Sequence, residues 1–344
     1  MKKNALILSI TLLIISSSYA FFHFTTKKVV VPRTVKIEFK GMNLVAPIKE
    51  LRSTTLDELQ AHHVNAVSLI PYAFVDIDNA AIRYNNKRQW WGEKTEGIMA
   101  SNALAHEYNM TVMLKPHLWI NHGFYTGNLD FATVAEWEKW ETDYEKYILD
   151  FARLAQTEKM ELFCFGTELG NSIAKRPQYW SQLIVKIKKI YTGKLTYAAN
   201  WDDFDKVPFW NELDYIGIDA YFPLSDAVTP TVAELNKAWK EHIQKMDKLQ
   251  AKINKKILFT EFGYRNSNAA AKEPWTENQN TMNNLAQANA YEALFQTLSQ
   301  KTWFAGGFAW KWYADEYHKQ KTNNVDYTPQ GKPALETIKK WYKK

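Results

Sequence analysis

Two glutamates, Glu168 and Glu261, stand at the ends of short apolar runs that lie far apart in the sequence. A carboxylate that is buried without a partner loses several kcal/mol of hydration, so such a residue needs a counter-ion or a chemical task. A salt bridge, for example between Glu261 and Arg265, would account for one of them. Two glutamates in equivalent places indicate instead a pair of carboxyl groups that act together.

Paired carboxyl groups are typical of glycoside hydrolysis, where one protonates the leaving oxygen and the other attacks the anomeric carbon. A separation of about 5–5.5 Å gives retention of configuration, whereas about 6.5–9.5 Å admits a water and gives inversion. At the shorter separation, an ionised Glu261 raises the pKa of Glu168 and keeps Glu168 protonated as the acid. Once Glu261 is esterified its charge is gone, and Glu168 can then act as a base towards water.

The elements that must position this pair are eight strand-like segments, each short, rich in β-branched or aromatic residues and bounded by turn residues. They cover residues 35–45, 66–74, 111–120, 162–169, 195–201, 215–222, 257–264 and 306–313. Between them, apolar residues recur at three- and four-residue spacing, which predicts helices. Eight such units over about 300 residues favour the α/β class and a single (β/α)8 TIM barrel. No glycine-rich fingerprint follows the first strand, which argues against a dinucleotide-binding fold.

The active site of such a barrel lies at the carboxyl ends of its strands. Because side chains alternate along a strand, we expect Glu168 to share the barrel interior with Cys164, and Glu261 to share it with Phe259. Polar and aromatic residues gather at the same strand ends and are expected to bind a saccharide. Those expected to bind hydroxyls are Lys115, His117, Asn200 and Asp219, and those expected to stack on sugar rings are Trp119, Trp201, Tyr221 and Trp310.

The composition agrees with a saccharide-binding protein and argues against other classes. Trp, Tyr and Phe make up 15% of the chain, and aromatic faces stack on sugar rings, although a Trp-rich core would give the same number. The eight histidines are scattered, so we expect no metal and no cofactor. The net charge of +6 forms no basic stripe with interleaved aromatics, so nucleic-acid binding is not expected. The single cysteine excludes an intrachain disulfide.

The amino terminus has the pattern of an export signal. Lys2 and Lys3 precede an apolar run over residues 5–15 and then small residues up to Ala20. We expect residues 1–20 to be a signal peptide or signal anchor, 21–34 a linker and 35–344 the catalytic domain. The protein is therefore expected to be exported and to be periplasmic, secreted or membrane-anchored facing outwards. It would meet the membrane only through an uncleaved leader.

Several motifs resemble those of glycoside hydrolase clan A, and within it most of all family 113, the β-mannanases. The two that carry the resemblance are Gly166-Thr167-Glu168-Leu169 and Phe259-Thr260-Glu261-Phe262-Gly263-Tyr264. Supporting motifs are Gly41-Met42-Asn43-Leu44, Trp90-Trp91-Gly92-Glu93, Lys115-Pro116-His117, Ile216-Gly217-Ile218-Asp219-Ala220-Tyr221 and Gly306-Gly307-Phe308-Ala309-Trp310. The resemblance implies a retaining enzyme, with Glu168 as acid/base, Glu261 as nucleophile and Trp310 as the platform under the sugar.

The chain departs from the clan pattern just before the acid/base. Many clan members carry Asn there to bind the sugar 2-hydroxyl, whereas this chain has Thr167, so Asn200 or His117 would have to supply that contact. The leading hypothesis is a retaining endo-β-1,4-mannanase acting on an oligo- or polysaccharide. The alternatives are another β-glycanase specificity, such as β-glucanase, and a non-catalytic carbohydrate-binding barrel.

Overall fold

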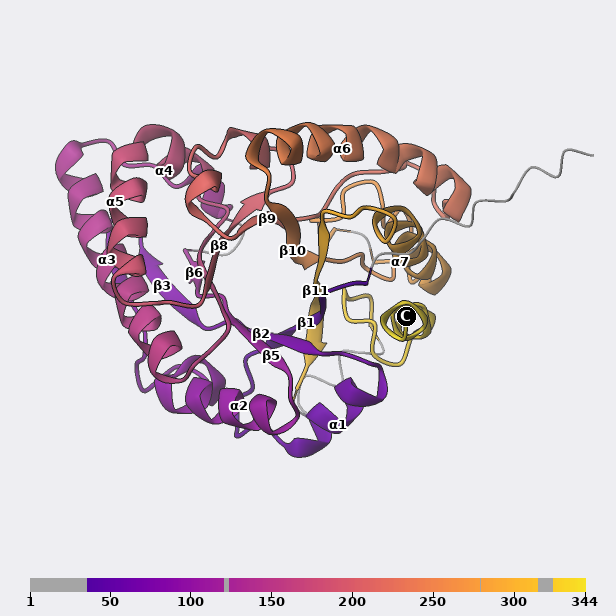
Figure 1. Cartoon of the computed structure of the whole chain (residues 1–344), viewed down its shortest axis with the longest axis horizontal. Helices are drawn as coiled ribbons and strands as arrows, with labels where there is room; N and C mark the ends of the chain where they lie inside the picture. Colours follow the sequence, from indigo (N-terminus) through magenta and orange to yellow (C-terminus); the bar gives the residue numbers. More distant parts are fainter. Residues whose placement is uncertain (1–35, 121–123, 279, 315–323) are drawn as a thin grey trace, which may run out of the picture. The chain divides into compact units, whose positions relative to one another are not determined.

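The computed structural model describes residues 36–120, 124–278, 280–314 and 324–344. Eight parallel strands close into a barrel in the order β1-β11-β10-β9-β8-β7-β5-β2. Their bounds are β1 (Phe39–Val45), β2 (Ala66–Leu69), β5 (Thr111–Leu114), β7 (Leu162–Thr167), β8 (Lys194–Asn200), β9 (Tyr215–Asp219), β10 (Lys256–Phe262) and β11 (Phe304–Tyr313). Figure 1 shows these strands as an inner ring with helices outside it. The predicted (β/α)8 barrel is therefore confirmed.

The helices lie along the outside of the barrel (Figure 1), and all but the last lie between two strands in the sequence. They are α1 (Ser53–Ala61), α2 (Thr95–Glu107), α3 (Val134–Thr157), α4 (Gly170–Lys175), α5 (Pro177–Lys188), α6 (Val232–Ile253), α7 (Asn284–Leu298) and α9 (Pro333–Tyr342). Short 3₁₀ turns are η1 (Trp91–Glu93), η2 (Thr126–Asn128), η3 (Phe204–Lys206) and η4 (Trp210–Glu212). The longest helices, α3 and α6, start at capping boxes built on Thr133 with Glu136 and on Thr231 with Glu234. Each box satisfies backbone N–H groups that a helix start would otherwise leave unpaired.

Two predicted strands are each divided in two. The segment 66–74 forms β2 and then β3 (Tyr72–Asp76), and the segment 111–120 forms β5 and then β6 (His117–Trp119). Pro71 and Pro116 stand at the breaks, because proline donates no backbone hydrogen bond to a strand ladder. Beyond the breaks, β3 and β6 join β4 (Ala81–Arg83) in a separate sheet with the order β4-β3-β6.

The barrel interior has its own small apolar cluster. It consists of Phe39, Ala66, Met113, Leu162, Cys164, Ala198, Tyr215, Leu258, Ala305 and Phe308. Cys164 lies inside as expected, but the predicted alternation on β10 is wrong, since Leu258 and not Phe259 faces inwards. The register of β10 against β9 shifts between Phe259 and Glu261. This irregularity restores the inward position of Glu261, as an extra residue in a strand does.

The predicted signal, the linker and residue 35 lie outside the described residues. Among the described residues, none of the helices has the length and apolarity that crossing a membrane requires.

Candidate active site

A cavity of about 760 Å³ opens at the carboxyl ends of the barrel strands, within the size range of ligand pockets. Glu168 and Glu261 both line it, from strands that are separated by β8 and β9 around the barrel. All but one of the predicted saccharide-binding residues also line it, namely His117, Trp119, Asn200, Trp201, Asp219, Tyr221 and Trp310. The exception is Lys115, which lies beneath the cavity.

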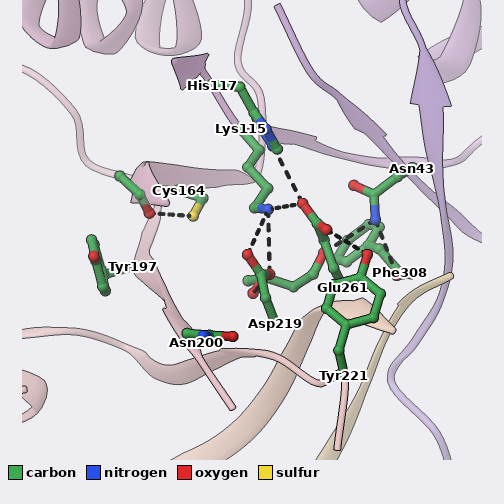
Figure 2. Close-up of polar contacts among 12 residues, drawn as sticks. Asn43, Lys115, His117, Cys164, Tyr197, Asn200, Asp219, Tyr221, Glu261 and Phe308 are labelled. Carbon is green, nitrogen blue, oxygen red and sulfur yellow. Dashed lines mark hydrogen bonds and ion pairs between the residues drawn. The ribbon is translucent and has the colours of Figure 1, made fainter. Parts of the chain in front are cut away.

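Glu261 lies near the end of β10 and is held by three neighbouring side chains, shown in Figure 2. Tyr221 donates its hydroxyl hydrogen to Oε2 over 2.7 Å. The Lys115 ammonium forms an ion pair with Oε1, and His117 Nε2 lies 3.4 Å from the same oxygen. Burial and the charge of Lys115 lower the pKa of His117 well below its usual value, so the imidazole is neutral. The carboxylate is thus fixed in orientation and has one close cation.

Lys115 is completely buried and has two carboxyl groups as partners. Its ammonium lies 3.2 and 3.3 Å from the two oxygens of Asp219, in addition to its pair with Glu261. Thr260 donates a further hydrogen bond of 2.7 Å to Asp219. Burial alone would lower the pKa of Lys115, but the charges of Asp219 and Glu261 reverse the effect and raise it, so the ammonium stays charged. Lys115 thus contacts two carboxyl residues that line the cavity, without lining the cavity itself.

We expect Lys115→Ala to reduce the free energy of unfolding by about 3 kcal/mol, because it leaves Asp219 and Glu261 buried without their cation. Denaturant unfolding at pH 7 measures the change. Lys194→Ala is the matched control, since Lys194 pairs with Asp214 at the surface and is 59% exposed. That control should lose less than about 1 kcal/mol. Equal losses in the two variants would show that the buried ion pair does not stabilise the fold.

Glu168 follows β7 directly and has an unusual backbone conformation. Its φ is 53°, in the left-handed region that residues with a side chain rarely occupy, and its amide donates to the carbonyl of Ala198 over 2.8 Å. Burial raises the pKa of Glu168 well above the usual value, and the negative charges of Asp219 and Glu261 raise it further. Glu168 therefore keeps its proton to a higher pH than an ordinary glutamate does, and can donate it.

Asn200, one candidate for the sugar 2-hydroxyl contact, already has protein partners. Its amide donates to the hydroxyl of Tyr125 over 2.8 Å, and its carbonyl oxygen accepts from the backbone amide of Trp201 over 2.9 Å. Burial and the charge of Glu168 raise the pKa of Tyr125, which places this phenol beside the acid. The buried hydroxyl of Thr167 has no hydrogen-bond partner among the described residues.

Aromatic rings stack in pairs along the cavity. The rings of Trp310 and His117 are 6.0 Å apart and nearly parallel, and the Trp310–Lys311 peptide bond is cis. Trp201 stacks on Trp275 with centroids 5.2 Å apart. Tyr72, Tyr125 and Trp275 also line the cavity, although the sequence patterns did not predict them as site residues. Tyr72 could have been found as the first residue after the break at Pro71, whereas the other two lie in loops whose paths the sequence does not specify.

The family sequence model named Glycoside Hydrolase Family 113 matches residues 49–332. The chain belongs to glycoside hydrolase family 113. It is therefore a glycoside hydrolase, and its substrate is a carbohydrate. Within the described ranges, no group of three or more His, Cys, Asp and Glu side chains could hold a metal ion.

Solved structures show the same fold. A GH113 β-1,4-mannanase, solved as a complex, has a TM-score of 0.77 and 21% identity, over 90% of this chain and 99% of that one. The GH113 β-mannanase AaManA from Alicyclobacillus acidocaldarius, in complex with ManMIm, has a TM-score of 0.77 and 22% identity, over 90% and 98% of the two chains. A β-glucuronidase from Faecalibacterium prausnitzii has a TM-score of 0.61 and 13% identity, and only 49% of its chain is covered. No curated protein matches the sequence.

Proposed function

We propose that this family 113 protein is a retaining endo-β-1,4-mannanase, with Glu168 as acid/base and Glu261 as nucleophile. The observation that carries the proposal is the different surroundings of the two glutamates in one cavity. Glu168 has its pKa raised by burial and by two negative neighbours, whereas Glu261 lies against the buried ammonium of Lys115. A carboxyl group that keeps its proton is suited to be the acid, and a carboxylate that lies beside a cation is suited to be the attacking anion. The GH113 neighbours described as β-1,4-mannanases support the choice of substrate.

The first half-reaction uses both groups at once. Glu261 attacks the anomeric carbon while Glu168 protonates the departing oxygen, which breaks the glycosidic bond and leaves the sugar esterified to Glu261. Tyr221 and Lys115 hold the attacking carboxylate in place. In the second half-reaction, Glu168 removes a proton from water and the water displaces Glu261 from the sugar.

Lys115 and Asp219 allow buried Glu261 to lose its negative charge when it becomes an ester. When Glu261 becomes an ester it no longer offers a negative charge to Lys115, and an unpaired buried ammonium is costly. Asp219 remains within 3.3 Å and serves as the counter-ion during the covalent intermediate. We infer that Lys115 acts on the sugar through Glu261, as a positioning residue, and that it does not bind a hydroxyl itself.

The sugar at the cleavage point would lie on Trp310, whose ring is backed by His117. Trp119, Trp201 and Tyr221 supply further aromatic surface around the cavity. The remaining N–H of Asn200 can reach a hydroxyl while its other amide hydrogen stays with Tyr125. The Thr167 hydroxyl, which has no partner within the described chain, is a further group that could bind the sugar 2-hydroxyl.

Asp219→Asn should move the alkaline limb of the pH profile of kcat/KM to lower pH by about one unit. Burial and the charge of Glu261 raise the pKa of Asp219 to about 7, so this residue gains its negative charge in the working range. Without that charge the pKa of Glu168 falls, and the protonated acid is lost at a lower pH. Hydrolysis of mannopentaose between pH 4 and 9 provides the measurement.

The control for this change is Asp202→Asn. Asp202 lines the same cavity but is exposed, so solvent screens its charge and the alkaline limb should stay in place. An Asp219→Asn enzyme that is slower by the same factor at every pH would show that the charge of Asp219 does not raise the pKa of Glu168.

The function is tested by following the anomers of the products by NMR during hydrolysis of mannopentaose. We expect β-configured products first, since two displacements restore the original configuration. Initial α-products would refute the retaining mechanism. Preferential hydrolysis of β-glucan oligosaccharides would replace the mannanase assignment by a β-glucanase one, and binding without any product would identify a non-catalytic barrel.

A further inference from the structure

The small sheet β4-β3-β6 has one face on the core and one face that is open. Ala73 and Val75 of β3 are buried in the main apolar cluster, so Tyr72 and Phe74, which alternate with them, point the other way. Phe74 is opposite Trp119 on β6 and opposite Arg83 on β4. Residues in register share a face, so aromatic rings continue into a cationic side chain across this sheet.

A second hollow of about 890 Å³ lies at the outer edge of this sheet. Phe74 and Tyr84 line it together with four cationic residues, Arg83, Lys87, Arg88 and Lys146, and no carboxylate of the described part of the chain is in its lining. The nearby acids have other partners. Asp143 lies 3.8 Å from the ammonium of Lys139, and Asp150 lies 2.8 Å from the guanidinium of Arg153. Arg83 has a 3.5 Å contact with Asp76, but its side chain is 68% exposed and stays accessible.

The charge of this hollow is opposite to that of the active-site cavity. Among the residues that the structure describes, five carboxyl residues and neither Lys nor Arg line the active-site cavity, namely Glu168, Asp202, Asp219, Glu261 and Glu277. Surfaces lined by one sign of charge concentrate ligands of the other sign and repel those of the same sign. An acidic sugar is therefore disfavoured at the cleavage point and favoured in the hollow.

The two spaces meet on the open face of the sheet. Trp119 lines the active-site cavity and its neighbour Phe74 lines the hollow, on adjacent strands about 5 Å apart. From His117 beside Glu261, the path to Arg83 runs two residues along β6 and two strands across, or roughly 16 Å. One saccharide chain can span this distance, with its rings over the aromatic residues.

We propose that the hollow beside β4 is a distal subsite for an acidic sugar, of the uronate class, on a chain whose neutral part is cleaved at Glu168 and Glu261. This inference rests on the proposed function for the cleavage step, but the binding itself does not depend on it. Arg83, Lys87 and Arg88 bind the carboxylate, and Phe74 supports the ring next to it.

The test is calorimetric titration of a β-1,4-linked hexamannuronate into the full chain at low ionic strength, with Glu261→Gln as the background to prevent turnover. A triple variant, Arg83→Gln with Lys87→Gln and Arg88→Gln, should bind about tenfold more weakly, because each exposed ion pair contributes modestly. The matched control changes Lys240, Lys248 and Lys252 on α6 to Gln, and should bind within about twofold of the parent. Phe74→Ala should also weaken binding.

Neutral mannohexaose provides the second measurement, with Glu261 intact. The triple variant at Arg83, Lys87 and Arg88 should hydrolyse it at a rate within about twofold of the parent, since the cations do not attract a neutral chain. Absence of hexamannuronate binding by the parent, or an equal loss in the two triple variants, would overturn the acidic subsite. The acidic subsite would also be overturned if the triple variant at Arg83, Lys87 and Arg88 lost as much hydrolysis of neutral mannohexaose as it lost affinity for hexamannuronate. Failure to hydrolyse mannohexaose, with selective hexamannuronate binding intact, would overturn the mannanase function and leave the subsite standing.

Discussion

Alanine in place of Glu261 should reduce hydrolysis of mannopentaose on the order of 10⁵-fold, because it removes the carboxylate that attacks the anomeric carbon in the proposed mechanism. Lys115 keeps Asp219 as its counter-ion in this variant, so its charge stays paired and the fold should survive. kcat and kcat/KM measured with a reducing-end assay give the loss. Circular dichroism and the melting temperature show whether the variant is folded.

Glu261→Gln is the matched variant, since it keeps the shape of the side chain and removes only its charge. It should be as inactive as the alanine variant. A residual activity above about one percent in either folded variant would mean that Glu261 is not the nucleophile.

Alanine in place of Glu168 should slow hydrolysis of mannopentaose by about 10⁴-fold, at the upper end of what general acid–base catalysis contributes. The loss should be much smaller for an aryl β-mannoside with a good leaving group, because such a group departs without a proton. Added azide should then accelerate turnover and give a β-mannosyl azide, since azide attacks the covalent intermediate without needing a base. Substrate panels with and without azide measure both effects.

The control for this second experiment is azide added to Glu261→Ala, which should give no β-mannosyl azide because no covalent intermediate forms. If Glu168→Ala loses activity equally on all leaving groups and azide has no effect on it, Glu168 is not the acid/base. In that case another cavity residue would have to donate the proton.

The barrel and most of the cavity could be predicted because both depend on local patterns. Apolar runs that alternate with amphipathic segments specify a parallel barrel, and the fold then carries residues at strand ends to one rim. Glu168, Asn200, Asp219 and Trp310 reach the cavity for this reason. No distant contact had to be known.

The features of the site that the sequence did not predict depend on irregular backbone or on contacts between segments that are distant in the sequence. Regular alternation back from Glu261 would place Phe259 in the barrel interior, but the register shift before Glu261 reverses the faces of β10. Lys115 was expected to bind hydroxyls, and only the tertiary structure shows that two carboxyl groups enclose it. Trp275 and Tyr125 come from loops, where neither period nor propensity specifies the path of the chain.

The left-handed backbone of Glu168 lowers the stability of the fold at a residue whose side chain the proposed mechanism needs. An L-residue with a side chain gives up about 1–2 kcal/mol in this conformation, which glycine would recover. The same replacement removes a half-buried acid that the proposed mechanism requires. Directed evolution of this chain for heat resistance alone would therefore favour glycine at position 168. The resulting protein would be more stable but inactive. Such a selection has to include a test for product formation.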